Sequence, residues 1–411
     1  MLLRSSIHIC GRAIGAGPAS LLLARSLLRS SIPFLIFERD QSISFRGQGY
    51  RLRLSSEGLD AIEDVLGPEP QGFPKFWAAC SKTGGTRGFG AINAITGSDV
   101  EDVWERPAAP GQQQPTKEIL ASRDGKTIGI SRGEMRALFL EGCESHIRWG
   151  HQVTGYELTP DGVQAVFKDG SKSQEGSLLV AGDGIYSKVA KQVSHGRIKT
   201  FDTGARGVHG QASTTAFKGL DEGVWRILDE SRPGGRVGVI TNVRPNDMNN
   251  PDVEFGWTMN GQSGVIKPPN DDFAIIGKPA ADIARSLTAN WHPRVKPMFD
   301  QINEDQAAFW KITCSSPSGV PEWPNEPRVT VMGDSVHSMT PAGGIGANTA
   351  VRDSALLGRL LREAGGWAED VTASYEKQMR IYASEAVAIS YGLATTGLGI
   401  KIDEETTPTV G

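Results

Sequence analysis

Two glycine-rich segments, each accompanied by acidic residues, are the parts of this sequence best suited to chemistry. The first is "GAGPAS" at 15–20, which follows an apolar stretch and precedes leucines and an alanine at helical spacing. The second is "GDSVHSMTPAGGIGANTAVRD" at 333–353, which has clustered glycines but lacks the Lys-Ser/Thr of a phosphate-binding P-loop. Both segments allow a ligand to approach the backbone closely, because glycine has no side chain.

The first segment has the pattern of a dinucleotide-binding site. Gly15 would permit a tight turn, and Gly17 would let a pyrophosphate reach the N-terminus of the following helix. A buried strand then ends at Glu38, 23 residues after Gly15, near the spacing of a ribose-binding carboxylate. Ser20 holds the third small position of the motif and is small enough for close packing.

The start of this motif is irregular. "CGRAIGAG" places Gly11 and Arg12 where an uninterrupted strand is expected. Either the strand is Arg12–Ile14 with a bulge, or four residues are inserted before the loop.

Two further apolar strands end in an acid beside a glycine. "SLLVAGDGIYSKVAK" at 177–191 ends in Asp183-Gly184, and "RVTVMGDSVHSM" at 328–339 ends in Gly333-Asp334. Strands of an open α/β sheet present such residues at the carboxyl edge, where ligands bind.

These motifs together resemble a known family, the class A FAD-dependent aromatic hydroxylases and monooxygenases of the para-hydroxybenzoate-hydroxylase-like fold. The glycine loop with its acid, the "AGDGIYS" motif and the "GDSVHSMTPAGGIGANTAVRD" motif occur in the family's order. "ISRGEMRALFL" at 130–140 and "GQGYRLRLSSEGLDAI" at 47–62 match two more family segments. The resemblance covers about 1–195 and 305–392, whereas 200–300 identifies no subfamily.

The resemblance implies that the two glycine loops hold opposite ends of one FAD molecule. The glycine loop would bind the pyrophosphate, Glu38 the adenosine ribose, and Asp334 the ribityl chain. Arg39 and Arg132 would lie along the adenosine–phosphate part of the cofactor, and the residues from Pro341 to Asn348 would lie beside the isoalloxazine ring. Asp183 belongs to a motif that the family associates with both FAD and NADPH. The predicted cofactor-binding residues are Gly15, Gly17, Pro18, Ala19, Glu38, Arg39, Arg132, Asp183, Gly333, Asp334, Pro341, Gly344, Gly346, Ala347 and Asn348.

The implied fold is α/β, with a Rossmann-like FAD-binding domain interleaved with a mostly antiparallel β-sheet substrate domain and followed by C-terminal helices. The discontinuous FAD-binding domain would comprise 1–75, 130–195 and 305–365. The substrate domain would comprise 76–129 and 196–304, and a C-terminal helix and tail would fill 366–411. Short β-type segments such as "VEFGWTMNG" support the antiparallel sheet.

The resemblance implies a monooxygenase that uses NADPH or NADH as reductant and inserts one oxygen atom from O₂ into an electron-rich small molecule. The reaction, aromatic hydroxylation or epoxidation, would pass through a flavin C4a-hydroperoxide and would suit specialised metabolism. A flavin oxidoreductase without oxygen insertion remains an alternative. A redox-silent binding or cyclisation protein on the same fold is the other.

The sequence identifies no catalytic acid or base. Tyr186 and His337 follow two of the motifs and are weak candidates, because packing explains each equally well. Aromatic residues and a methionine of the central region could line a substrate pocket, although such residues in a sheet more often belong to the core. These pocket candidates are Phe217, Trp225, Phe255, Trp257 and Met259.

Composition narrows the partners further. A net charge of −4 over 411 residues gives no electrostatic reason to expect nucleic acid. The four cysteines are far apart and form no CxxC pair, so we expect reduced thiols and no metal site. "LLLARSLL" at 21–28 is too short to span a bilayer, so we expect no stable membrane insertion and a cytoplasmic protein.

Overall fold

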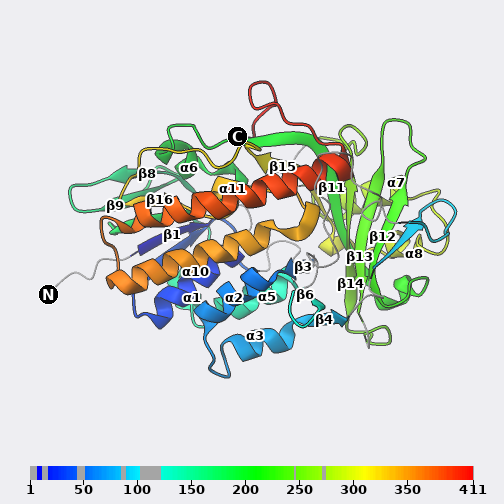
Figure 1. Ribbon diagram of the computed structural model, residues 1–411, viewed down its shortest axis with the longest axis horizontal. Helices are drawn as coiled ribbons and strands as arrows, with labels where there is room; N and C mark the ends of the chain where they lie inside the picture. Colours follow the sequence, from blue (N-terminus) through cyan, green and yellow to red (C-terminus); the bar gives the residue numbers. More distant parts are fainter. Residues whose placement is uncertain are drawn as a thin grey trace.

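The computed structural model describes residues 7–11, 17–43, 51–84, 89–101, 122–244, 247–270 and 275–410. The predicted fold class is confirmed, because a parallel Rossmann-type sheet lies beside a larger, mostly antiparallel sheet (Figure 1). Within the described ranges, no helix combines the length and apolarity needed to cross a bilayer.

Five strands form the parallel sheet in the order β16-β10-β1-β2-β7. The strands are β1 (Ile7–Gly11), β2 (Phe34–Glu38), β7 (Ile147–Arg148), β10 (Leu178–Gly182) and β16 (Val329–Val331). The strand order reverses direction between β1 and β10, which is where doubly wound sheets bind ligands. β1 ends at Gly11, and residues 12–16 lie outside the described residues, so the choice between bulge and insertion stays open.

Helices pack against this sheet, with α1 on β1 and with α6 and α11 on β16. α10 lies beside α1 and α2, and the long α11 runs alongside it (Figure 1). α1 buries four of its leucines completely (Leu21, Leu22, Leu23 and Leu27), whereas Leu28 is exposed. Pro18 suits the first turn of this helix because the N–H that proline lacks has no partner within the helix there. The helices are α1 (Pro18–Arg29), α2 (Ser56–Leu66), α3 (Phe73–Ala79), α5 (Arg132–Leu140), α6 (Lys188–Val193), α9 (Asp334–His337), α10 (Gly346–Ala364) and α11 (Val371–Leu398).

The second large sheet has six strands in the order β15-β11-β14-β13-β12-β5, with antiparallel pairing except between β12 and β5. Its apolar residues alternate with polar ones, and the apolar face packs on α7 (Lys278–Leu287) and α8 (Pro297–Asp300). The strands are β5 (Phe89–Asn93), β11 (Thr200–Ser213), β12 (Gly223–Asp229), β13 (Val237–Val243), β14 (Glu254–Gly261) and β15 (Ala308–Ser315).

Smaller elements complete the chain. β3 (Arg51–Leu54), β6 (Lys126–Ser131) and β4 (Ser81–Gly84) form a three-stranded sheet, and β8 (Val153–Leu158) pairs with β9 (Val163–Phe167). Five 3₁₀ helices, η1 to η5, span Glu144–His146, Gly184–Tyr186, Thr214–Phe217, Glu304–Gln306 and Ala342–Gly344. The domain limits stay a prediction. The expected limit at residue 305 assigns β15 to the FAD-binding domain, whereas β15 pairs with β11 of the six-stranded sheet.

Candidate functional site

A cavity of about 480 Å³ lies where the parallel sheet, the β3–β6–β4 sheet and the six-stranded sheet meet. Its size is that of a small-molecule site. One side of its wall comes from the segments that follow the parallel strands, which are Gly17–Ser20, Gly182, Gly184, Gly333–Asp334 and the stretch from Pro341 to Ala347. The structure therefore brings together the two glycine-rich segments, which are more than 300 residues apart in sequence.

The first glycine loop leads directly into helix α1. Gly17 is the N-cap, and Gly17, Pro18 and Ala19 all line the cavity. Ser20 also contributes to the wall and is buried, as its small size allows. The backbone N–H groups at this helix start suit a pyrophosphate. Gly15 lies outside the described residues.

Glu38 ends β2 and is completely buried. Its Oε1 accepts a hydrogen bond from the backbone N–H of Asp40 at 2.9 Å, while Oε2 has no partner among the described residues. Burial raises the pKa of Glu38 to about 7, against the hydrogen bond from Asp40. A ribose hydroxyl bound at this strand end would supply the hydrogen-bond donor that the Glu38 Oε2 atom lacks.

Three other predicted cofactor residues differ in how close they lie to the cavity. Arg132 begins α5, is buried and lines the cavity. Asp183 is buried between Gly182 and Gly184, two residues of the cavity wall. Arg39 lies 3.6 Å from the carboxylate of Asp40 and, like Glu38, is not among the described residues that line this cavity.

The second glycine segment folds back toward the first. Gly333 has φ +61° and ψ −144°, a conformation that side chains strongly disfavour. A Cβ atom there would meet Ala350 at 3.6 Å and Ala19 at 3.9 Å, so the two loops approach closely. Gly343 and Gly344 also have positive φ, and Nη2 of Arg53 donates to the Gly343 carbonyl at 2.9 Å.

Asp334 follows Gly333 at the start of α9, and its side chain is exposed to the cavity that it lines. Its depth in the molecule raises the pKa of this carboxyl, and the positive charges of His337 and Arg132 oppose that effect. Asp334 is thus placed to accept hydrogen bonds from a ligand in the cavity.

Asn348 does not face the cavity with its side chain. Its Oδ1 accepts from the Ser55 backbone at 2.8 Å, and its Nδ2 donates to the carbonyls of Arg53 and Gly344, each at 2.9 Å. The amide therefore fastens the second glycine segment to the chain around β3.

His337 belongs to a buried network behind the same segment. Its Nε2 lies 2.7 Å from Oδ2 of Asp353, which also accepts from the Gly333 backbone at 2.7 Å. The Tyr382 hydroxyl donates to Oδ1 of Asp353 at 2.7 Å. Burial lowers the pKa of His337, but the carboxylate of Asp353 outweighs it and raises the pKa above the usual value. Neither His337 nor Tyr186 is among the described residues that line the cavity.

The six-stranded sheet closes the other side of the cavity with mostly polar residues. The sequence patterns did not single them out, because polar residues that alternate with apolar ones are typical of any half-buried strand. They are His209, Arg226, Asn242, Thr258, Asn260 and Trp310. Burial lowers the pKa of His209 to about 4, although a hydrogen bond with the Trp257 backbone opposes this, so the imidazole is neutral at physiological pH.

The aromatic candidates for the pocket belong mainly to the core. Phe217, Phe255 and Met259 are completely buried and pack in the cluster under α7 and α8. Trp257 lines the cavity, yet its indole donates to the Met298 carbonyl at 3.1 Å on that far face. Trp225 packs in the same cluster.

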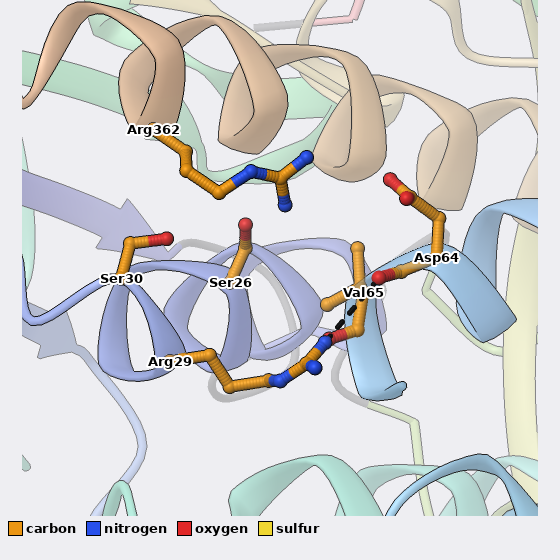
Figure 2. A pocket seen from close by; sticks show the side chains of 6 residues that line it. All are labelled: Ser26, Arg29, Ser30, Asp64, Val65 and Arg362. Atoms are coloured by element: carbon orange, nitrogen blue, oxygen red, sulfur yellow. Dashed lines mark hydrogen bonds between the residues drawn. The ribbon is translucent and has the colours of Figure 1, made fainter. Parts of the chain in front are cut away.

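A second, smaller cavity of about 210 Å³ lies away from this site, where α1, α2 and α10 end (Figure 2). Nη1 of Arg29 donates to the Val65 carbonyl at 2.6 Å and thereby satisfies the C-terminus of α2. Arg362 stands in the last turn of α10. Cations at helix C-termini stabilise those ends, so these arginines have a structural role.

The main site fits an extended dinucleotide such as FAD. The helix that starts at Gly17 suits its pyrophosphate, and the unpaired carboxylate oxygen of Glu38 suits its ribose. The glycines between Gly333 and Gly346 leave room for its ring. No group of three or more His, Cys, Asp or Glu residues in the described part of the chain could hold a metal ion. Fold and site thus define a protein of the Rossmann-like class with a site suited to a dinucleotide.

Comparison with known proteins identifies the family. The model of the family described as "FAD binding domain" matches residues 136–390, more than half of the chain. The chain therefore belongs to this family, and the predicted resemblance to the FAD-dependent family is confirmed.

Curated relatives carry matching names. The chain is 28% identical to the dual O-methyltransferase/FAD-dependent monooxygenase elcB of Phaeosphaeria nodorum, over 95% of this chain and 46% of that protein. The chain thus spans about half the length of that relative. It is 25% identical to the FAD-dependent monooxygenase thnD of Trichoderma harzianum, over 84% of this chain and 81% of that protein.

Solved structures agree on the fold. Klebsiella pneumoniae HpxO in complex with FAD and uric acid superposes with a TM-score of 0.69 at 20% identity. The match covers 96% of this chain and 90% of that chain.

Proposed function

We propose that this chain is an NADPH- or NADH-dependent monooxygenase that inserts one oxygen atom from O₂ into an electron-rich aromatic small molecule held between the cofactor and the six-stranded sheet. The observation that supports the proposal most strongly is the single cavity that joins the glycine loops to a polar sheet wall. The relatives named FAD-dependent monooxygenases support it independently.

The residues that would hold FAD are those of the two glycine segments and their acids. Gly17, Pro18 and Ala19 would bind the pyrophosphate, and Glu38 would accept from the adenosine ribose. Arg132 and Asp334 would contact the cofactor between these ends, while Pro341, Gly344, Gly346 and Ala347 would lie against the ring. FAD supplies the redox chemistry when bound, accepting hydride from a nicotinamide and activating O₂.

The chain's own contribution is position and electrostatics. Helix α10 begins at Gly346 in the cavity wall, so its N-terminus directs partial positive charge toward the cofactor ring. That field would stabilise negative charge at the ring edge. His209 would stay neutral and act by hydrogen bonding, and the sheet wall would exclude water and orient the substrate.

Two alternatives use the same fold. A flavin oxidoreductase without oxygen insertion would consume NADPH and O₂ but form no oxygenated product. A redox-silent binding or cyclisation protein would hold FAD without consuming NADPH. A cytoplasmic location stays a prediction from the sequence.

Isotope labelling separates the three possibilities. Purified protein with FAD is incubated with NADPH, ¹⁸O₂ and a panel of phenols, and products are analysed by mass spectrometry. The proposal expects one ¹⁸O atom per product molecule. NADPH consumption with hydrogen peroxide alone across the panel favours the oxidoreductase, and no consumption favours the redox-silent protein.

A further inference from the structure

Helix α11 passes the second glycine segment and ends against the six-stranded sheet (Figure 1). Near that end, Ala394 packs in a small apolar cluster with Ala205 of β11 and Ile312 of β15. The Gly397 carbonyl also accepts a hydrogen bond from Arg236, which directly precedes β13. The C-terminal part of α11 is therefore fixed by the sheet that closes the cavity.

Ser390 of α11 and Thr340 form a reciprocal pair of hydrogen bonds. The Thr340 hydroxyl donates to the Ser390 carbonyl at 3.1 Å, and the Ser390 hydroxyl donates to the Thr340 carbonyl, also at 3.1 Å. The two hydroxyl oxygens lie 2.8 Å apart, and both side chains are buried. Thr340 lines the cavity directly before Pro341, so this pair anchors the start of the segment that we assign to the cofactor ring.

The contact with α11 continues along the segment. The Thr340 hydroxyl oxygen also accepts from the backbone N–H of Ala342 at 3.3 Å. Leu393 lies one helical turn after Ser390, and a Cβ atom at Gly343 would meet its Cδ1 atom at 2.8 Å. Because this distance is shorter than a van der Waals contact, the lack of a side chain at Gly343 is what lets the segment lie so close to the helix.

We propose that Ser390 is a positioning residue for the flavin. Through Thr340 it fixes the segment from Pro341 to Ala347 in the shape that receives the isoalloxazine ring. Arg53 and Asn348 hold later carbonyls of the same segment. Ser390 does not line the cavity in the described structure, so it acts through Thr340 and not on the ligand. This inference rests on the proposed function, since it takes FAD to bind in that orientation.

The anchor affects one end of the cofactor more than the other. A surface that is already ordered needs no free energy to become ordered when a ligand arrives. Without the Ser390 hydroxyl, the buried Thr340 carbonyl loses this donor, which favours movement of the segment. The ring end of FAD would bind this loosened segment, whereas the adenosine and pyrophosphate would still meet Gly17 and α1.

The test compares FAD with ADP, which contains the adenosine and pyrophosphate but no flavin ring. Fluorescence titration of the FAD-free protein measures the affinity for FAD, and displacement of FAD measures the affinity for ADP. Ser390→Ala is expected to lower the affinity for FAD roughly three- to tenfold, the value of one hydrogen bond, and to leave the affinity for ADP unchanged. The visible absorption bands of the bound flavin should move toward those of free FAD.

Ser384→Ala is the matched control on the same helix. The Ser384 hydroxyl accepts from the Val320 backbone at 2.9 Å, and Val320 is outside the cavity wall that the structure describes. This variant should lower the melting temperature as Ser390→Ala does, yet leave both affinities unchanged. Ser390→Cys, which weakens the hydrogen bond and keeps a side chain of similar shape, serves if Ser390→Ala fails to fold.

A double variant tests whether Ser390 acts through Thr340. The loss of FAD affinity in Ser390→Ala combined with Thr340→Val should be clearly smaller than the product of the two single losses, because each substitution breaks the same contact. A double variant whose loss equals that product would overturn the pairing of the two residues as the cause.

The outcomes separate this inference from the proposed function. Wild type that binds no FAD contradicts the proposed function itself. A Ser390→Ala variant that binds FAD as the wild type does, or that loses affinity for FAD and ADP equally, overturns the positioning role and leaves the function standing. Equal losses of FAD affinity in Ser384→Ala and Ser390→Ala would also overturn it.

Discussion

Replacing Asp353 with asparagine should destabilise the protein in a pH-dependent way. The Asp353 carboxylate accepts from the Gly333 backbone, from His337 and from Tyr382, each at 2.7 Å, and it is completely buried. The raised pKa of His337 means that its protonated form is stabilised in the folded state. Such a histidine contributes stability fully below its unfolded pKa of about 6.5, and the contribution is lost as the pH rises through the higher folded value.

The loss of stability in Asp353→Asn depends on the charge of His337, the hydrogen-bond partner of Asp353. Below pH 6.5 the substitution leaves a buried imidazolium without its counter-ion, which costs about 3–5 kcal/mol. As the pH rises through the raised folded pKa of His337, the imidazole loses its charge, and the loss falls toward about 2 kcal/mol for the weakened hydrogen bonds. The difference in melting temperature between wild type and Asp353→Asn should therefore shrink as the pH rises.

The assay is thermal unfolding followed by fluorescence from pH 5.5 to pH 9, with two controls. Tyr382→Phe removes one neutral donor and should cost about 1 kcal/mol with little pH dependence. Asp252→Asn changes an exposed acid and should leave the profile unchanged. A difference for Asp353→Asn that is constant across this pH range would refute the assignment of a charged His337–Asp353 pair.

Two further predictions concern cofactor residues. Glu38→Gln should raise the melting temperature of the FAD-free protein at pH 8 and should lower the affinity for FAD. The buried Glu38 carboxyl has its pKa raised to about 7, so its ionisation destabilises the fold as the pH rises from about 4.5 through 7. Equal melting temperatures of the two proteins at pH 8 would count against this destabilising role of Glu38. Gly333→Ala should lower FAD affinity about tenfold or more, since a side chain at φ +61° and ψ −144° strains the backbone by about 1–3 kcal/mol. Gly365→Ala, at a helix C-terminus with φ +72° and open space around it, is the matched control: absorbance titration should show unchanged FAD affinity, and equal losses in both variants would contradict a specific role for Gly333.

Local patterns predicted well the strand ends and helix starts that surround the cavity. The strand that ends at Glu38, the helix that begins after Gly17 and the turn at Gly333 each follow from residues adjacent in sequence. Their convergence on one cavity also follows from the order of a doubly wound sheet. What the sequence could not show is that the Asn348 amide is used within the protein, because its partners lie near residue 54.

The substrate side was less predictable for a physical reason. The alternation in β14 shows two faces, but it does not show which face a cavity covers and which face helices cover. The pairing of Gly207 with both Trp310 and Asn260 depends on long-range register. Likewise, Tyr382 meets Asp353 because α11 packs along α10, and no local motif predicts such packing.

A crystal structure of the protein with FAD tests the central claim most directly. The account predicts the pyrophosphate at the N-terminus of α1 beside Gly17, and the isoalloxazine ring against the segment from Pro341 to Ala347, facing the six-stranded sheet. Density that placed the ring elsewhere, or a protein that bound no FAD at saturating concentration, would contradict it.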